Sequence, residues 1–150
     1  MGIKRDLLIY LWISSIFSCI HSKKDVVCEL AAFIEDPDGS NPQRIDSGKG
    51  PASLSDCDEE SQKKCIKAVE HQVKEGTRNG NFSLSIDQEE YTIGDVLCDK
   101  ADQVQENVRN KMVQIYWRLC DSKWQKTSFR MPEPLCCDDG LYVPCKIIYS

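Results

Sequence analysis

Cysteines are the feature that most restricts how this 150-residue chain can fold. Nine are present: one lies in an apolar N-terminal segment and eight lie downstream of it. The downstream set is Cys28, Cys57, Cys65, Cys98, Cys120, Cys136, Cys137 and Cys145. An even set of this size is typical of disulfide frameworks formed in the oxidising secretory pathway. A zinc site would need closely paired ligands such as C-x-x-C, which the sequence lacks. We therefore expect four disulfides, no metal and no cofactor.

The first 22 residues have the pattern of a secretory signal peptide. Lys4 and Arg5 form a basic start, residues 7–20 are almost entirely apolar, and Ser22 is a small residue at a suitable cleavage point. The apolar run is too short to predict a membrane span. We expect residues 1–22 to be removed and residues 23–150 to form one secreted, extracellular domain.

The domain predicted for residues 23–150 is acidic. It carries 17 basic and 23 acidic residues, so its formal net charge is −6. Nucleic acids and anionic membrane surfaces attract dense positive charge, so the sequence argues against binding to either and against direct membrane insertion. We expect a monomer whose partner is an extracellular or membrane-bound protein.

Hydrophobic periodicity predicts an α+β domain with two helices on an antiparallel sheet of about five strands. Alternating apolar residues predict a strand over 25–35 that carries Cys28 on its inner face. Residues 36–53 are rich in Gly, Pro, Asp and Ser, which predicts a long exposed loop. Ser55 followed by acidic residues predicts the start of a helix over 55–75. The side chains expected on its buried face are Cys65, Val69 and Val73.

The C-terminal half is predicted to add two hairpins, a helix and a short final strand. In chain order these are a hairpin of 82–86 and 91–93, a helix over 95–110, a hairpin of 111–120 and 124–130, and a strand at 141–143.

Geometry excludes some cysteine pairings. On the predicted helix, Cys57 and Cys65 would lie roughly 12 Å apart along the axis, beyond the reach of one disulfide. A bond between the neighbours Cys136 and Cys137 would close a strained ring. We therefore expect this doublet to bond in two directions and tie the C-terminal segment to two elements, with the first helix and the second hairpin as the favoured partners. Many other pairings stay open.

The sequence offers little for catalysis, and we assign no catalytic residue. A cysteine doublet precedes the catalytic histidine of secreted phospholipases, but the doublet here is followed by Asp138, Asp139 and Gly140. His71 is the one histidine after residue 22, and a lone histidine on a helix surface is more often solvated than catalytic. Paired carboxylates that hydrolyse glycosides remain an open alternative, because their separation is invisible in sequence.

Two surface features are predicted. Asn81, Phe82 and Ser83 form an N-glycosylation sequon, which predicts an exposed, modified Asn81 in a secreted chain. The segment 116–130 is basic and aromatic in an otherwise acidic chain. Its hairpin tip, with Lys123, Trp124 and Lys126, is the expected contact with an acidic target. The alternative is that Trp117 and Trp124 are core residues and the cations are ordinary surface charge.

The overall plan resembles the longer multi-cysteine scoloptoxins of centipede venoms. The shared features are a signal peptide, one anionic domain with eight cysteines, the CC doublet, and a final cysteine in the segment YVPC. The resemblance implies a secreted venom protein or toxin that acts on an ion channel or receptor, and it carries over no residue beyond the cysteines. The alternatives are a secreted structural or carrier module without toxic activity and, in third place, a weak hydrolase.

Overall fold

The computed structural model of the chain describes residues 26–86 and 90–146, so the predicted signal peptide lies outside the described residues. The domain is α+β, as predicted, with two helices and an antiparallel sheet of four strands in the order β2-β1-β3-β4. A separate two-stranded sheet, β5-β6, replaces the fifth strand that was expected. The elements are β1 (Val26–Glu35), β2 (Gln43–Leu54), α2 (Glu59–Gly76), α3 (Ile93–Asp102), β3 (Met112–Leu119), β4 (Gln125–Arg130), β5 (Cys137–Asp138) and β6 (Leu141–Tyr142).

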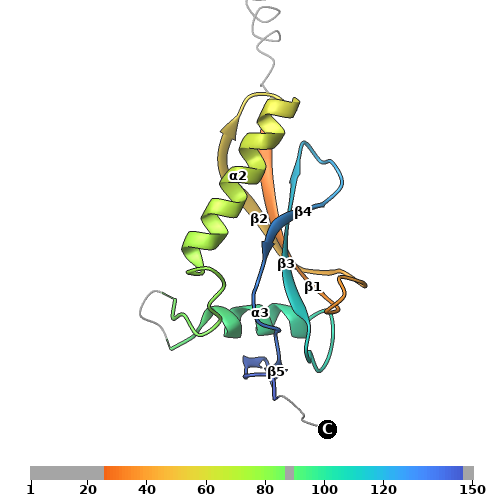
Figure 1. The fold of residues 1–150 in the computed structure, drawn as a ribbon, viewed down its shortest axis with the longest axis vertical. Helices are drawn as coiled ribbons and strands as arrows, with labels where there is room; N and C mark the ends of the chain where they lie inside the picture. Colours follow the sequence, from red (N-terminus) through yellow and green to blue (C-terminus); the bar gives the residue numbers. More distant parts are fainter. Residues whose placement is uncertain (1–25, 87–89, 147–150) are drawn as a thin grey trace, which may run out of the picture.

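One face of the sheet forms the core. In Figure 1, α2 runs alongside the sheet and α3 lies across its lower end. The buried stripe of α2 is the predicted one, and it packs against alternate residues of β1 and β3. The β3 residues in this core are Val113, Ile115, Trp117 and Leu119, as the alternating pattern predicted. None of the helices in the described part of the chain contributes to the small cluster on the opposite face, which contains Ala31, Phe33 and Tyr116. No described helix is both long and apolar enough to cross a bilayer.

The predicted loop over 36–53 is wrong for most of its length, because Gln43–Leu54 is a strand paired with β1. Local composition misled the prediction. A Cβ at Gly50 would lie 3.0 Å from Cys28 Sγ and 3.4 Å from Val69 Cγ2, so glycine allows β2 to pass close to the core. Pro51 lies at a register shift in this edge strand, where a missing backbone N–H is tolerated.

Helix α2 begins four residues later than predicted. Asp58, rather than Ser55, is the N-cap, and its Oδ1 accepts a hydrogen bond from Ser61 N at 2.8 Å. Cys57 therefore precedes the helix. Cys57 and Cys65 do not pair with each other, as expected, but the reason we gave, that both lie on one helix, is wrong.

The predicted elements between 82 and 110 also need correction. Within the described residues, the expected hairpin of 82–86 and 91–93 is a single bridge between Ser85 and Thr92; residues 87–89 lie outside the description. Helix α3 begins at Ile93, because Thr92 and Asp95 form a capping box, and it ends at Asp102. The apolar pattern beyond it was misleading, since Val104 is exposed and Asn107 has a left-handed φ of 56°.

All eight downstream cysteines are bonded, which confirms the four expected disulfides. The bridges are Cys28–Cys65, Cys57–Cys120, Cys98–Cys137 and Cys136–Cys145. The doublet does bond in two directions, but its expected partners are wrong. Cys137 is bonded to Cys98 in α3, which packs against β5 and β6, while Cys136 closes a short loop within the C-terminal segment.

Candidate functional site

The candidate site is the sheet face opposite α2, which we call the open sheet face. It consists of Glu29, Ala31, Phe33, Glu35, Tyr116, Arg118, Trp124 and Lys126. Strand periodicity places these residues here, because every second side chain of β1 and β3 points away from the core. The β1–β3 register sets Ala31 opposite Tyr116 and Glu29 opposite Arg118. The face therefore joins residues about 90 positions apart in the chain.

Aromatic rings form the centre of the open sheet face. The ring centroids of Phe33 and Tyr116 are 4.0 Å apart, and Trp124 meets Phe33 edge-on at 6.2 Å. The Arg118 guanidinium lies over the Trp124 ring at 4.4 Å, and Arg44 of β2 lies 6.0 Å from the same ring. Contacts of cations with indole rings are favourable and hold both groups in place. Trp124 is half-buried, so part of the indole remains available to a partner.

Ion pairs surround the aromatic centre. Arg118 donates two hydrogen bonds to Glu29, from Nε at 2.6 Å and Nη2 at 3.1 Å. The hydrogen bond to Glu29 raises the pKa of Arg118 above its ordinary value. On the other side, Lys126 Nζ lies 2.8 Å from an oxygen of Glu35, whose side chain is only 1 % exposed. This hydrogen bond raises the pKa of Lys126, while burial raises the pKa of Tyr116 beneath it.

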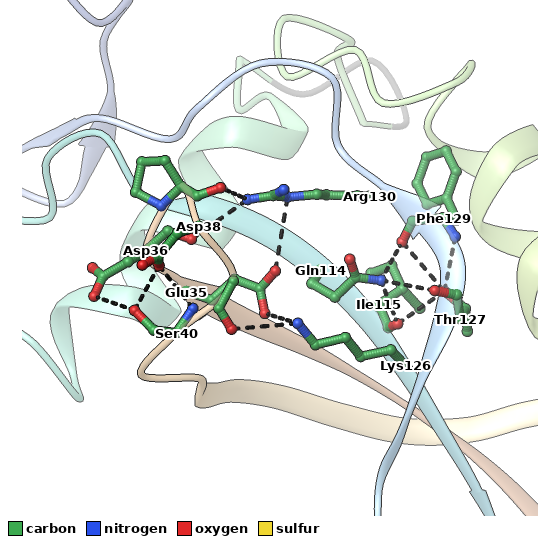
Figure 2. A network of polar contacts seen from close by, with 12 residues as sticks. Glu35, Asp36, Asp38, Ser40, Gln114, Ile115, Lys126, Thr127, Phe129 and Arg130 are labelled. Carbon is green, nitrogen blue, oxygen red and sulfur yellow. Dashed lines mark hydrogen bonds and ion pairs between the residues drawn. The ribbon is translucent and has the colours of Figure 1, made fainter.

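A bulge in β4 fixes where Lys126 and Arg130 point. The register shifts between the Gln114 and Tyr116 pairs, so residues 127–129 form an irregular stretch opposite Ile115. The buried Gln114 amide fills this gap by donating to three backbone carbonyls of the bulge region, at 2.9 to 3.1 Å. Figure 2 shows the result: Lys126 and Arg130 reach Glu35 from two directions.

The three predicted contact residues have different positions. Lys123 is exposed in the β3–β4 turn, Trp124 lies in the aromatic cluster, and Lys126 is engaged by Glu35. Ser128 does not share their face, because the bulge turns its amide and hydroxyl to Glu70 of α2, both at 2.7 Å. Trp117 is a core residue, as the alternative held, whereas Trp124 is not part of the main core cluster.

Sequence reasoning missed the four β1 members of the open sheet face, Glu29, Ala31, Phe33 and Glu35, and the neighbouring Arg44 of β2. Phe33 was placed in a predicted strand, but no face of the sheet was assigned to its side chain. Arg44 lay in a segment that was predicted to be a loop. The alternation of Glu29, Ala31, Phe33 and Glu35 along β1 was the available signal.

Two aspartates that follow β1, Asp36 and Asp38, have pKa values below the ordinary one. A hydrogen bond from Lys111 lowers the pKa of Asp36, and hydrogen bonds from Ser40 lower the pKa of Asp38. A general acid in glycoside hydrolysis needs the opposite shift. His71 is exposed on α2.

Asn81 occupies an ordered corner after α2. Its backbone N donates to Thr77 O at 2.8 Å, and its side-chain Oδ1 accepts from Ser83 N at 3.0 Å. Asn81 and Ser83 are both exposed, whereas Phe82 between them is 2 % exposed and packs against Tyr142. Burial of Phe82 thus fixes this segment with Asn81 and Ser83 at the surface.

Comparison with protein-family models, with curated proteins and with solved structures gives no significant match to this chain.

Proposed function

We propose that the protein is a secreted, disulfide-stabilised binding protein that docks on an acidic surface of an extracellular protein. The open sheet face and the adjacent turn form the contact. The observation that carries this proposal is Trp124, a half-buried indole that contacts Arg118 and Phe33 on the open sheet face. Tryptophan, tyrosine and arginine dominate the energetic centres of protein interfaces.

The charges around Trp124 support an acidic partner. Arg118 and Lys126 are already paired with glutamates. Lys123 and Arg44, by contrast, make no ion pair among the described residues. Arg44 of β2 lies 6.0 Å from the indole of Trp124, and Lys123 directly precedes Trp124 in the β3–β4 connection. Complementary charge of this kind accelerates encounter with an anionic patch more than it stabilises the complex.

The proposal also includes an extracellular location and a role as a venom toxin. Four disulfides support an oxidising, extracellular location. The assignment as a toxin acting on an ion channel or receptor rests on the resemblance to centipede venom proteins. Transcripts confined to a venom gland would support it. Broad epithelial expression would contradict it and favour a structural or carrier module.

We expect Lys123→Glu to slow association with the target about two- to tenfold at low salt, with little change in dissociation, because the substitution reverses the charge at the exposed turn. Surface plasmon resonance at several ionic strengths measures both rates. Lys67→Glu is the matched control, since Lys67 is exposed on α2, on the other side of the sheet. Equal association rates for the two variants would exclude the turn as the contact. Lys126→Glu is a poorer test, because it places two carboxylates together at buried Glu35.

We further expect an N-linked glycan on Asn81 when the protein is made in a eukaryotic secretory host. The sequon follows α2, which packs on the side of the sheet opposite the open sheet face, so we expect a glycan there to leave the proposed contact uncovered. Treatment with peptide-N-glycosidase F should reduce the mass and convert Asn81 to Asp. Asn81→Gln should abolish the mass change, and an unmodified Asn81 in the secreted wild type would refute this expectation.

A further inference from the structure

The four disulfides differ in their exposure. Cys57 and Cys120 are both exposed. Each of the other bridges has at least one buried cysteine: Cys28–Cys65, Cys98–Cys137 and Cys136–Cys145. Thiol–disulfide exchange requires that a thiolate reach a sulfur of the bridge, so access controls which bridge reacts. The Cys57–Cys120 bridge is therefore the first candidate for exchange with an external thiol.

This exposed bridge is attached to the turn that presents the proposed contact. Cys120 and Asp121 are the central residues of a β-turn at the start of the β3–β4 connection, and this turn is closed by a hydrogen bond from Ser122 N to Leu119 O at 3.1 Å. Their φ angles are 54° and 56°, so both lie in the left-handed region. Glycine and asparagine are the residues that adopt a positive φ most readily, because most side chains disfavour it. A restraint on Cys120 therefore helps to hold this conformation.

The disulfide to Cys57, just before α2, provides that restraint. Cys57 directly precedes Asp58, the N-cap of α2, and its bond to Cys120 spans 63 residues of sequence. Ser122 adds a local restraint, because its Oγ accepts a hydrogen bond from Leu119 N at 3.3 Å. Lys123 and Trp124 follow immediately. A change at the bridge is therefore transmitted to these two residues over a few bonds of backbone.

We infer that Cys57–Cys120 is a thiol-exchange site that controls how Lys123 and Trp124 are presented; the second part of this inference rests on the proposed docking function. A small thiol or a dithiol protein attacks one sulfur, forms a mixed disulfide and releases the other cysteine as a thiolate. A second thiol attacks the external sulfur of this mixed disulfide and releases the remaining cysteine as a thiolate. The bridge thus gains two electrons and two protons, and the two attacking thiols become a disulfide.

The rest of the domain keeps its fold when this bridge opens. Cys28–Cys65 holds β1 to α2 and Cys98–Cys137 holds α3 to β5, and all four of these cysteines are at most 2 % exposed. Opening Cys57–Cys120 removes no buried side chain, so the local consequence is a turn with more conformational freedom.

Stepwise reduction of the folded protein with dithiothreitol, followed by alkylation and peptide mapping, tests the order. Cys57 and Cys120 should be labelled first, while the other six cysteines stay bonded. Hydrogen exchange of the Ser122 amide should then accelerate about tenfold or more, because its bond to Leu119 O opens more often. Prior labelling of any other pair, or unchanged exchange at Ser122, would overturn the inference.

Two double variants distinguish a local opening of the turn from a general loss of stability. Cys57→Ser with Cys120→Ser should show the rapid Ser122 exchange without reductant. Cys136→Ser with Cys145→Ser removes a bridge elsewhere and should leave Ser122 protected; rapid exchange there would contradict a local effect. The labelling order and the Ser122 exchange are both measured without a target. Failure of the oxidised protein to bind any target would therefore overturn only the proposed function.

If reduction opens the turn but target association is unchanged, the inference that the bridge controls docking is overturned.

Discussion

Replacing both cysteines of the core bridge, Cys28→Ala with Cys65→Ala, is expected to leave little folded, secreted protein. This bridge joins the central strand β1 to α2, and both sulfurs are buried. Releasing a constraint across 37 residues of sequence costs about 4 kcal/mol in the chain-entropy description. The cavity left by two buried sulfurs adds about 2 kcal/mol. Domains of this size are stable by only about 5–15 kcal/mol.

The matched control for this experiment is Cys57→Ala with Cys120→Ala. It also removes two sulfurs and releases a longer segment of 63 residues, so chain entropy alone predicts at least as large a loss. We expect the smaller loss, because its sulfurs are exposed and no cavity forms. Secretion yield and urea unfolding of the two double variants provide the comparison. A greater loss for the exposed bridge would show that buried packing around Cys28 and Cys65 is not decisive.

The second large effect is expected at the buried carboxylate of Glu35. Lys126→Met should lower the free energy of unfolding by about 2–3 kcal/mol, because it leaves a buried charge without its closest partner. The loss is smaller than for a fully buried pair, because the Lys126 side chain is 45 % exposed and Arg130 Nε remains 3.7 Å from Glu35. Figure 2 shows both cations at this carboxylate. Replacing Glu35 and Lys126 together by methionine should recover part of the loss, since no isolated charge then remains.

The pH dependence of this effect has a definite sign. The pKa of Lys126 is raised in the folded protein, so its ion pair contributes fully below the pKa of an unfolded lysine and is lost as pH rises through the folded value. The difference between wild type and Lys126→Met should therefore be constant near neutrality and shrink above about pH 10.5. Lys63→Met is the control: its pair with Glu59 is exposed on α2, and the expected change is below about 0.5 kcal/mol. Equal unfolding free energies for the two variants would contradict the account of Glu35.

Local pattern was sufficient to predict the elements whose packing repeats regularly. The alternation along β1 and β3 and the spacing of Val69 and Val73 on α2 each predicted the correct buried face. Strand β2 could not be predicted in this way. Its glycines and proline are typical of loops, but Gly50 is required by the close approach of Cys28, whose bridge is formed elsewhere in the chain.

The sequence identified one segment of the candidate site but not the β1 residues and ion pairs that complete it. The segment 116–130 was recognised as basic and aromatic, and Trp124 and Lys123 remain its proposed contacts. The ion pair of Lys126 with Glu35 was not predictable, because Glu35 lies 91 residues away in the sequence. The cysteine pairing was underdetermined for the same reason. Adjacency in the sequence correctly excluded a Cys136–Cys137 bond, but the position of α3 beside β5 decided where Cys137 is bonded.

The most direct test of docking through the open sheet face is site-specific photocrosslinking. A benzoylphenylalanine at position 123 and, in a second protein, at position 67 would be irradiated with intact cells that respond to the protein. The account predicts a crosslink to one extracellular protein from position 123, lost with Trp124→Ala in a still folded chain, and none from position 67. Equal crosslinking from both positions, or a crosslink at 123 that Trp124→Ala leaves unchanged, would contradict it.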